Sequence, residues 1–187
     1  MTLVWSNRND IADGVNEECS KSGLTQFGRQ VVAEMNRLGM AVDVSHISTY
    51  GFWDVLEHST KPIIATHSCA YSLCDHPRNL RDDQLKAIAK TGGFVGINFA
   101  GQFLEKDWND ACIESVCRHL AYMMDVMGCD DYLGFGSDFD GISHPPYNLR
   151  GVQDFVPLFD LLSKKFSDET IRKLAYKNGI AYLEKVL

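Results

Sequence analysis

The sequence has no run of about 18 apolar residues, the length that a membrane-spanning helix needs. Its N-terminus also lacks the charged and then apolar segments that are typical of a secretory signal peptide. Basic clusters are missing too, because 18 Lys and Arg are spread among 25 Asp and Glu, for a net charge of -7. Nucleic acids and anionic membranes bind concentrated positive charge, so we expect neither as a partner. We expect a cytoplasmic protein that acts on a small molecule.

The six cysteines form no C-x-x-C pair, and several lie within apolar helical patterns. They are therefore interpreted as reduced thiols that pack as small hydrophobic residues. No glycine-rich phosphate loop follows any of the predicted strands, which argues against a nucleotide-binding, doubly wound fold.

The 187 residues, 45% hydrophobic and 23% charged, have the composition of one globular domain, and we assign residues 1–187 to it. Five short apolar runs are predicted as buried strands: Met1–Val4, the run ending at His46, the run ending at His67, Phe94–Asn98 and Tyr132–Gly136. Helical patterns alternate with them, and two further helices are expected within Val152–Leu187. This alternation predicts an α/β fold with a parallel sheet, either open or closed as a (β/α)8 barrel.

Helix boundaries are marked by capping residues. Thr25 and Ser167 are each placed to cap the start of a helix, and Gly39 to end the first one. In that first helix one face is predicted to be apolar and buried, made of Phe27, Val31, Val32, Met35 and Leu38.

Polar or aromatic residues follow the predicted strands at their carboxyl ends: Trp5, His46, His67, Asn98 and Asp138. The helix between the two histidines makes a β-α-β unit, whose strands run parallel, so both imidazoles should meet on one rim of the sheet. Catalytic and metal-binding groups gather at this rim in α/β enzymes. The alternative is that each histidine only caps its strand through backbone hydrogen bonds.

Other polar residues have simpler interpretations. Asp43 alternates with His46 along its strand, so we expect it to face away from the rim and to support neighbouring helices. Asp140 is interpreted as a turn residue, and Cys69 beside His67 is a competing candidate nucleophile. The remaining histidines are expected on the surface or in packing, and among them His76 could approach a substrate through Arg78: His58, His76, His119 and His144.

Five motifs occur in one order along the chain: VDVSH, ATHSCAY, HPRN, VGINF and GSDFDG. With the opening MTLVWSNRNDIADG and the helix GLTQFGRQVVAEMNRLGM, they make the chain resemble the membrane (renal) dipeptidase family of zinc metallopeptidases. The resemblance implies two zinc ions on a barrel rim, with His46 and His67 binding one and Asp138 contacting the other while handling the proton of the attacking water. It also implies that Arg78 binds the carboxylate of a dipeptide substrate; the alternative is a solvated Arg78 or one paired with Asp75 or Asp82.

The chain departs from the family pattern at three points. It lacks the segments that carry a His-x-Asp pair and a Glu bridging both metals, and Trp5 stands where mammalian members have a histidine. A complete barrel has eight strands and about 250 residues, so the resemblance implies a partial barrel corresponding to strands four to eight.

Two hypotheses follow. The chain is a zinc dipeptidase whose missing ligands come from an upstream segment or another chain, or it is a catalytically incompetent partial barrel. An open half barrel exposes strand edges, so we expect a homo-oligomer that covers Met1–Val4 and Tyr132–Gly136.

Overall fold

The computed structural model describes all residues from Met1 to Leu187. Its central element is a parallel sheet. Three strands have regular pairing in the order β1 (Ile64–Ala65), β2 (Phe94–Ile97) and β3 (Leu133–Phe135). Single parallel bridges from Thr2 to Asp43 and from Asp43 to Ile64 extend the sheet by two further segments. All five predicted segments therefore lie side by side in sequence order, as successive strands of a barrel do, and the predicted partial barrel is confirmed.

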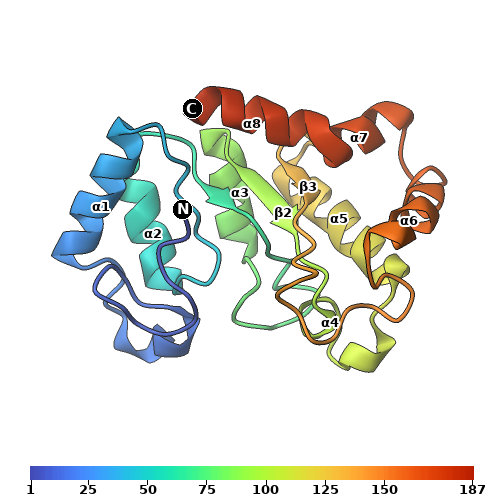
Figure 1. Cartoon of the computed structure of the whole chain (residues 1–187), viewed down its shortest axis with the longest axis horizontal. Helices are drawn as coiled ribbons and strands as arrows, with labels where there is room; N and C mark the ends of the chain where they lie inside the picture. Colours follow the sequence, from blue (N-terminus) through green and yellow to red (C-terminus); the bar gives the residue numbers. More distant parts are fainter.

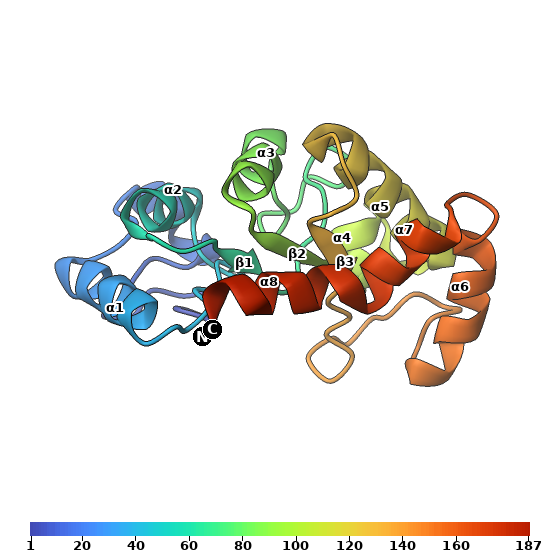
Figure 2. The same cartoon turned by 90° about the horizontal axis from the view of Figure 1, so that it is seen from above.

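Helices connect the segments and cover one face of this sheet. Their bounds are α1 Gln26–Arg37, α2 Thr49–His58, α3 Asp82–Thr91 and α5 Ile113–Met127. Figure 2 shows α2, α3 and α5 on one side of the strands and the C-terminal helix on the other. None of the helices is long and apolar enough to cross a bilayer.

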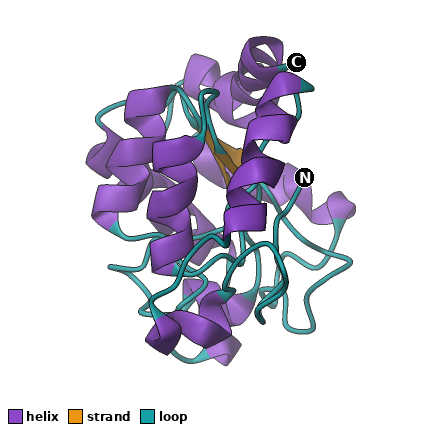
Figure 3. Ribbon diagram, turned by 90° about the vertical axis from the view of Figure 1, so that its left-hand side faces the viewer, coloured by secondary structure: helices purple, strands orange, loops and turns teal.

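The C-terminal part forms α6 (Phe155–Leu162), α7 (Asp168–Arg172) and α8 (Asn178–Val186), with a π-helical turn joining the last two. The prediction of two helices here is right, because α7, the π turn and α8 are continuous. Helix α8 crosses the start of the sheet (Figure 1), where Tyr182 donates to the Pro62 carbonyl at 3.1 Å and Lys61 to the Val186 carbonyl at 2.8 Å. Most loops gather at the opposite end of the molecule, beyond the carboxyl ends of the strands (Figure 3).

The predicted caps form. The hydroxyl of Thr25 accepts from the Gly28 amide at 2.9 Å, and that of Ser167 from the Thr170 amide at 3.1 Å. Gly39, just after α1, has a φ of +71°, a left-handed conformation that glycine adopts without steric cost. Three short elements were not predicted: 3-10 helices at Val15–Ser20 and Trp108–Asp110, and α4 at Gly101–Leu104.

One prediction about α1 is wrong. Val32 and Met35 are buried, but Phe27 and Leu38 are 54% and 55% exposed. These two residues line an apolar surface hollow of about 380 Å³ together with Met1 and Met40. They stay exposed because the first segment of the sheet pairs on one side only, so no further element packs against this face of α1.

Candidate metal and substrate site

His46 and His67 meet at the carboxyl edge of the sheet, as their matched positions predicted. Their Nε2 atoms lie 2.9 Å apart, and the ring centroids 5.0 Å apart at an angle of 62°. Neither imidazole bonds to the backbone, so the alternative of simple strand caps is excluded. The structure therefore points two ring nitrogens at one position.

Backbone strain marks the same edge. Only three non-glycine residues have a positive φ, and two of them are His46 at 71° and Asp138 at 62°. Side chains rarely adopt this conformation, which costs on the order of 1–3 kcal/mol, and such strain concentrates at functional sites. The fold thus holds two predicted site residues in a costly geometry.

Both imidazoles are neutral at neutral pH. Burial, then the charge of Arg78 and then His67 lower the pKa of His46 to about 3. Burial and Arg78 also lower the pKa of His67, although the carboxylates of Asp138 and Asp43 oppose this shift. A neutral imidazole has the free electron pair that a metal ion requires.

Hydroxyl groups hold the outer nitrogen of each ring. Ser6 Oγ lies 3.2 Å from Nδ1 of His46, and Thr66 Oγ1 lies 2.7 Å from Nδ1 of His67. Sequence reasoning missed both residues, although a hydroxyl directly before a strand-end histidine, as in Thr66-His67, is a usable signal. These contacts fix the orientation of the rings, as supporting groups do around metal ligands.

Arg78 is buried beside the histidines, not solvated as the alternative interpretation held. Its side chain is 6% exposed, and its Nη2 has no hydrogen-bond partner. Burial lowers its pKa to about 10, which leaves the guanidinium charged at neutral pH. It pairs with neither Asp75 nor Asp82; Asp82 instead accepts from Ser72 and Tyr122. A buried, unpaired guanidinium is unfavourable, so an anion placed beside it would stabilise this group.

Asp138 lies at the end of β3, where the sequence predicted it. Asn98 Nδ2 donates to its Oδ2 at 3.2 Å, so the buried Asn98 lies behind the carboxylate and does not line the rim cavity. A Cβ at position 141 would come within 2.3 Å of Asp138 Oδ1, so a larger residue than Gly141 would displace this carboxylate. Asp140 lies in the same turn and is exposed, as predicted.

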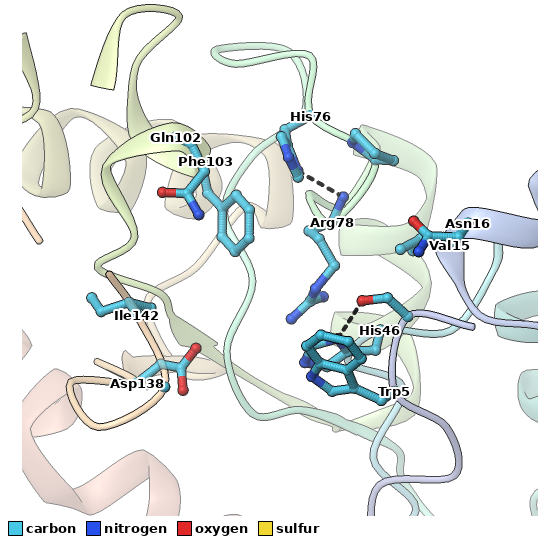
Figure 4. Close-up of a pocket in the computed structure, with 13 residues that line it drawn as sticks. Trp5, Val15, Asn16, His46, His76, Arg78, Gln102, Phe103, Asp138 and Ile142 are labelled. Atoms are coloured by element: carbon cyan, nitrogen blue, oxygen red, sulfur yellow. Dashed lines mark hydrogen bonds between the residues drawn. The ribbon is translucent and has the colours of Figure 1, made fainter. Parts of the chain in front are cut away.

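A cavity of about 410 Å³ joins these groups, and its walls include Trp5, His46, His76, Arg78, Gln102, Phe103 and Asp138. Figure 4 shows the Arg78 guanidinium extending toward Trp5 and His46, with Asp138 on the other side of the cavity. The chain has two buried side-chain atoms without a partner, Arg78 Nη2 and Gln102 Oε1, and both residues line this cavity. Its wall thus combines an unpaired donor, an unpaired acceptor and a carboxylate.

His76 lines the cavity, as its neighbour Arg78 suggested. Its Nδ1 accepts from the Arg78 amide at 3.2 Å, and its ring lies 4.4 Å from that of Phe103. The other three histidines lie outside this cavity. His119 is fully buried between Ala70 and Leu104, to which its two ring nitrogens bond, and is therefore a packing residue as predicted.

One interpretation needs correction, and one alternative is excluded. Asp43 is buried, but it bonds to Thr2, Ser45 and Thr66 on the parallel segments and not to helices. Cys69 is 0% exposed, and burial raises the pKa of its thiol well above the ordinary range. A thiol that is buried and protonated is a poor nucleophile, so the competing cysteine chemistry is excluded.

The histidine pair fits a shared metal ion. Two nitrogen ligands of one tetrahedral zinc, each about 2.0–2.1 Å from the metal, lie about 3.3 Å apart. The Nε2 atoms are 2.9 Å apart, so a small separation of the rings would admit the ion. No group of three or more His, Cys, Asp or Glu side chains in the chain is arranged to hold a metal, however. The residues present thus supply two converging ligands.

Comparison with known proteins identifies the family that the sequence motifs resemble. The model of the membrane dipeptidase family, peptidase family M19, matches residues 1–186. A Klebsiella pneumoniae protein known as the uncharacterized protein in the pqqA 5′ region is 38% identical over 191 residues, covering 97% of this chain and 70% of its own. An uncharacterized dipeptidase of Schizosaccharomyces pombe is 37% identical over 165 residues, covering 88% of this chain and 40% of its own.

Solved structures extend this likeness to the whole fold. A metallopeptidase from Rhodobacter sphaeroides, liganded with a phosphinate mimic of the dipeptide L-Ala-D-Ala, superposes with a TM-score of 0.92 and 35% identity over 100% of this chain. The M19 metallopeptidase called dipeptidase AC gives a TM-score of 0.89 and 36% identity over 98% of it. The chain spans 55% of the length of each of these two structures. On this family match and these likenesses, the chain belongs to the membrane dipeptidase family, peptidase family M19.

Proposed function

We propose that this chain carries part of the active site of a zinc-dependent dipeptidase, with His46 and His67 holding one metal ion. The observation that carries the proposal is the convergence of two neutral imidazoles, 2.9 Å apart at Nε2, beside a buried guanidinium that lacks a partner. Zinc, when bound, would lower the pKa of water to near 7 and polarise the scissile carbonyl.

The residues of the chain have separate roles in this proposal. Arg78 binds the C-terminal carboxylate of a small dipeptide, because a planar guanidinium matches a carboxylate with two hydrogen bonds. Asp138 accepts the proton of the attacking water and returns it to the leaving amine. Asn98 holds one carboxylate oxygen of Asp138 at 3.2 Å and so orients it for this transfer.

The remaining metal ligands would come from residues outside this sequence. Catalytic zinc sites use at least three protein ligands, and the chain brings together only two converging histidines. They would come from a further segment of the same protein or from another chain. Chains would also associate through the uncovered ends of the sheet, because the Thr2 segment and β3 each pair on one side only.

Zinc titration of the purified chain tests this proposal. We expect weak, substoichiometric zinc binding by the wild type and at least a tenfold loss in His46→Ala and His67→Ala, as removal of one of two ligands implies. His144→Ala, which removes an exposed histidine outside the cavity, is the matched control and should bind as the wild type does. Zinc binding that is unchanged in both site variants would exclude the histidine pair.

Hydrolysis of Gly-Leu and of L-Ala-D-Ala should be measured on the same samples, with and without zinc. The second dipeptide is chosen because the Rhodobacter neighbour holds a mimic of it. Zinc-dependent turnover accompanied by an oligomer in light scattering would indicate a site completed between chains. A zinc-binding chain without turnover would indicate the incompetent partial barrel.

A further inference from the structure

We propose that Asp43 and Thr66 are positioning residues for His67: the Asp43 carboxylate orients the Thr66 hydroxyl, which holds His67 with its proton on Nδ1 and its electron pair on Nε2. This inference deepens the proposed function, because it explains how the chain prepares one metal ligand before a metal arrives. Only the predicted effect on zinc affinity rests on the proposed function, because the hydrogen bonds themselves do not require a metal.

The Asp43 carboxylate receives four hydrogen bonds in a site that is 3% exposed. Its Oδ1 accepts from the amides of Ser45 at 2.9 Å and Thr66 at 3.1 Å. Its Oδ2 accepts from the hydroxyls of Thr2 at 2.6 Å and Thr66 at 2.7 Å. Two of these donors are amides that can only donate, so Oδ1 is an acceptor. Burial raises the pKa of this carboxyl, but the hydrogen bonds from Thr2, Ser45 and Thr66 outweigh burial and lower the pKa below its ordinary value, so the group is ionised at neutral pH and Oδ2 also accepts.

The Thr66 hydroxyl links the Asp43 carboxylate to the His67 ring. A hydroxyl has one hydrogen and two acceptor positions, and the hydrogen of Thr66 is used on Asp43. At 2.7 Å from Nδ1 of His67, Thr66 Oγ1 must therefore accept, and Nδ1 must carry the ring proton. Nε2 is then left with a free electron pair that faces His46.

The peptide beside the ring is held as well. The His67 amide donates to Ser45 Oγ at 3.2 Å, and that hydroxyl lies 3.3 Å from Thr66 Oγ1. Asp43 thus ties together three neighbouring parallel segments, at Thr2, at its own position and at Thr66. Because these contacts belong to the sheet itself, the orientation of His67 is as rigid as the strand pairing.

His46 has no equivalent support. Its Nδ1 contacts only the Ser6 hydroxyl, at 3.2 Å, which can donate or accept as the ring requires. With the Nε2 of His67 as acceptor at 2.9 Å, His46 must donate from its own Nε2 when no metal is bound. Metal binding then requires the proton of His46 to move to Nδ1, while His67 needs no change.

Imidazole nitrogen NMR on the metal-free chain tests the arrangement directly. The wild type should show His67 with the proton on Nδ1 and His46 with the proton on Nε2. Thr66→Val should lose the fixed Nδ1–H form of His67, and Thr66→Ser should restore it. Thr2→Val, which removes a different donor to Asp43, is the matched control and should leave the His67 signals unchanged.

Zinc affinity gives the second readout. We expect Thr66→Val to bind zinc 10 to 100-fold more weakly, the usual effect of losing a group that supports a metal ligand, and Thr66→Ser to bind within a few fold of wild type. If Thr66→Val does not fold, Thr66→Ala takes its place.

A wild-type His67 protonated on Nε2, or a Thr66→Val chain (or its Thr66→Ala replacement) with unchanged tautomer and affinity, would overturn the proposal. A wild type that shows the expected tautomers but binds no zinc would refute the proposed function alone.

Discussion

The two ends of the parallel sheet satisfy their polar groups in opposite ways. At the start of the strands, Asn178 of α8 donates to the Asp130 and Leu133 carbonyls at 2.6 and 2.9 Å, and Tyr182 bonds to Pro62. At the carboxyl end, Arg78 and Gln102 keep buried atoms without partners.

We interpret this difference as a division of roles: the strand starts stabilise the fold, and the strand ends carry the proposed site. In barrel enzymes the face at the strand starts contributes stability and the face at the strand ends contributes chemistry. We expect the same division here, because strained backbone and depressed imidazole pKa values occur among the candidate site residues at the strand ends. We therefore expect substitutions at the two ends to change the free energy of unfolding in opposite directions.

The largest loss should come from Asn178→Ala. This change leaves the main-chain carbonyls of Asp130 and Leu133 without their side-chain donor and should lower the free energy of unfolding by about 3 kcal/mol, measured by urea denaturation. Tyr182→Phe removes one hydrogen bond and should cost about 1 kcal/mol. Equal and negligible effects of both changes would show that α8 does not stabilise the sheet.

Acid should lower the free energy of unfolding, and protonation of the buried His119 is one cause. Burial lowers its pKa to about 4, whereas an unfolded chain has a histidine pKa near 6.5. Between these values the unfolded chain binds the proton more tightly, so stability falls as the pH falls, by about 2 kcal/mol at pH 5 from this group.

Urea denaturation from pH 7 to pH 4 measures this effect. His119→Gln should be less stable at pH 7 but should lose less stability on acidification than the wild type does. Met123→Leu, a buried change on the same helix without a titrating group, is the control and should shift the whole curve evenly. Parallel curves for wild type and His119→Gln would contradict the prediction.

The smallest effect has the opposite sign. Arg78→Met removes a buried charge without a full set of partners and should raise the free energy of unfolding by about 1 kcal/mol, while abolishing carboxylate binding in the proposed site. Arg81→Met is the matched control, because the Arg81 guanidinium already lies 4.1 Å over the Tyr71 ring. A loss of stability in Arg78→Met larger than in Arg81→Met would remove the contrast between the two ends.

Local sequence signals predicted the helices and the order of the sheet. Caps such as Thr25 and Ser167 act on neighbouring amides, so their effect is visible within a few residues. The meeting of His46 and His67 also followed from topology, since parallel strands place equivalent ends on one edge.

Local sequence signals could not predict side-chain contacts between segments that are distant in the sequence. Alternation along one strand placed Asp43 away from the rim, but it could not reveal that the amides of two other residues, Ser45 and Thr66, turn toward its carboxylate. The exposure of Phe27 was missed for a related reason, because helical periodicity identifies an apolar face and not what covers it.

The position of α8 has a consequence for the order of folding. Each parallel segment finds its partner in the next segment of the sequence, whereas Lys61 and Val186 are 125 residues apart, and Pro62 and Tyr182 120 residues apart. Closing such long loops carries the greatest entropy cost, so these contacts form late. During synthesis the strand starts therefore stay uncovered until α8 has left the ribosome.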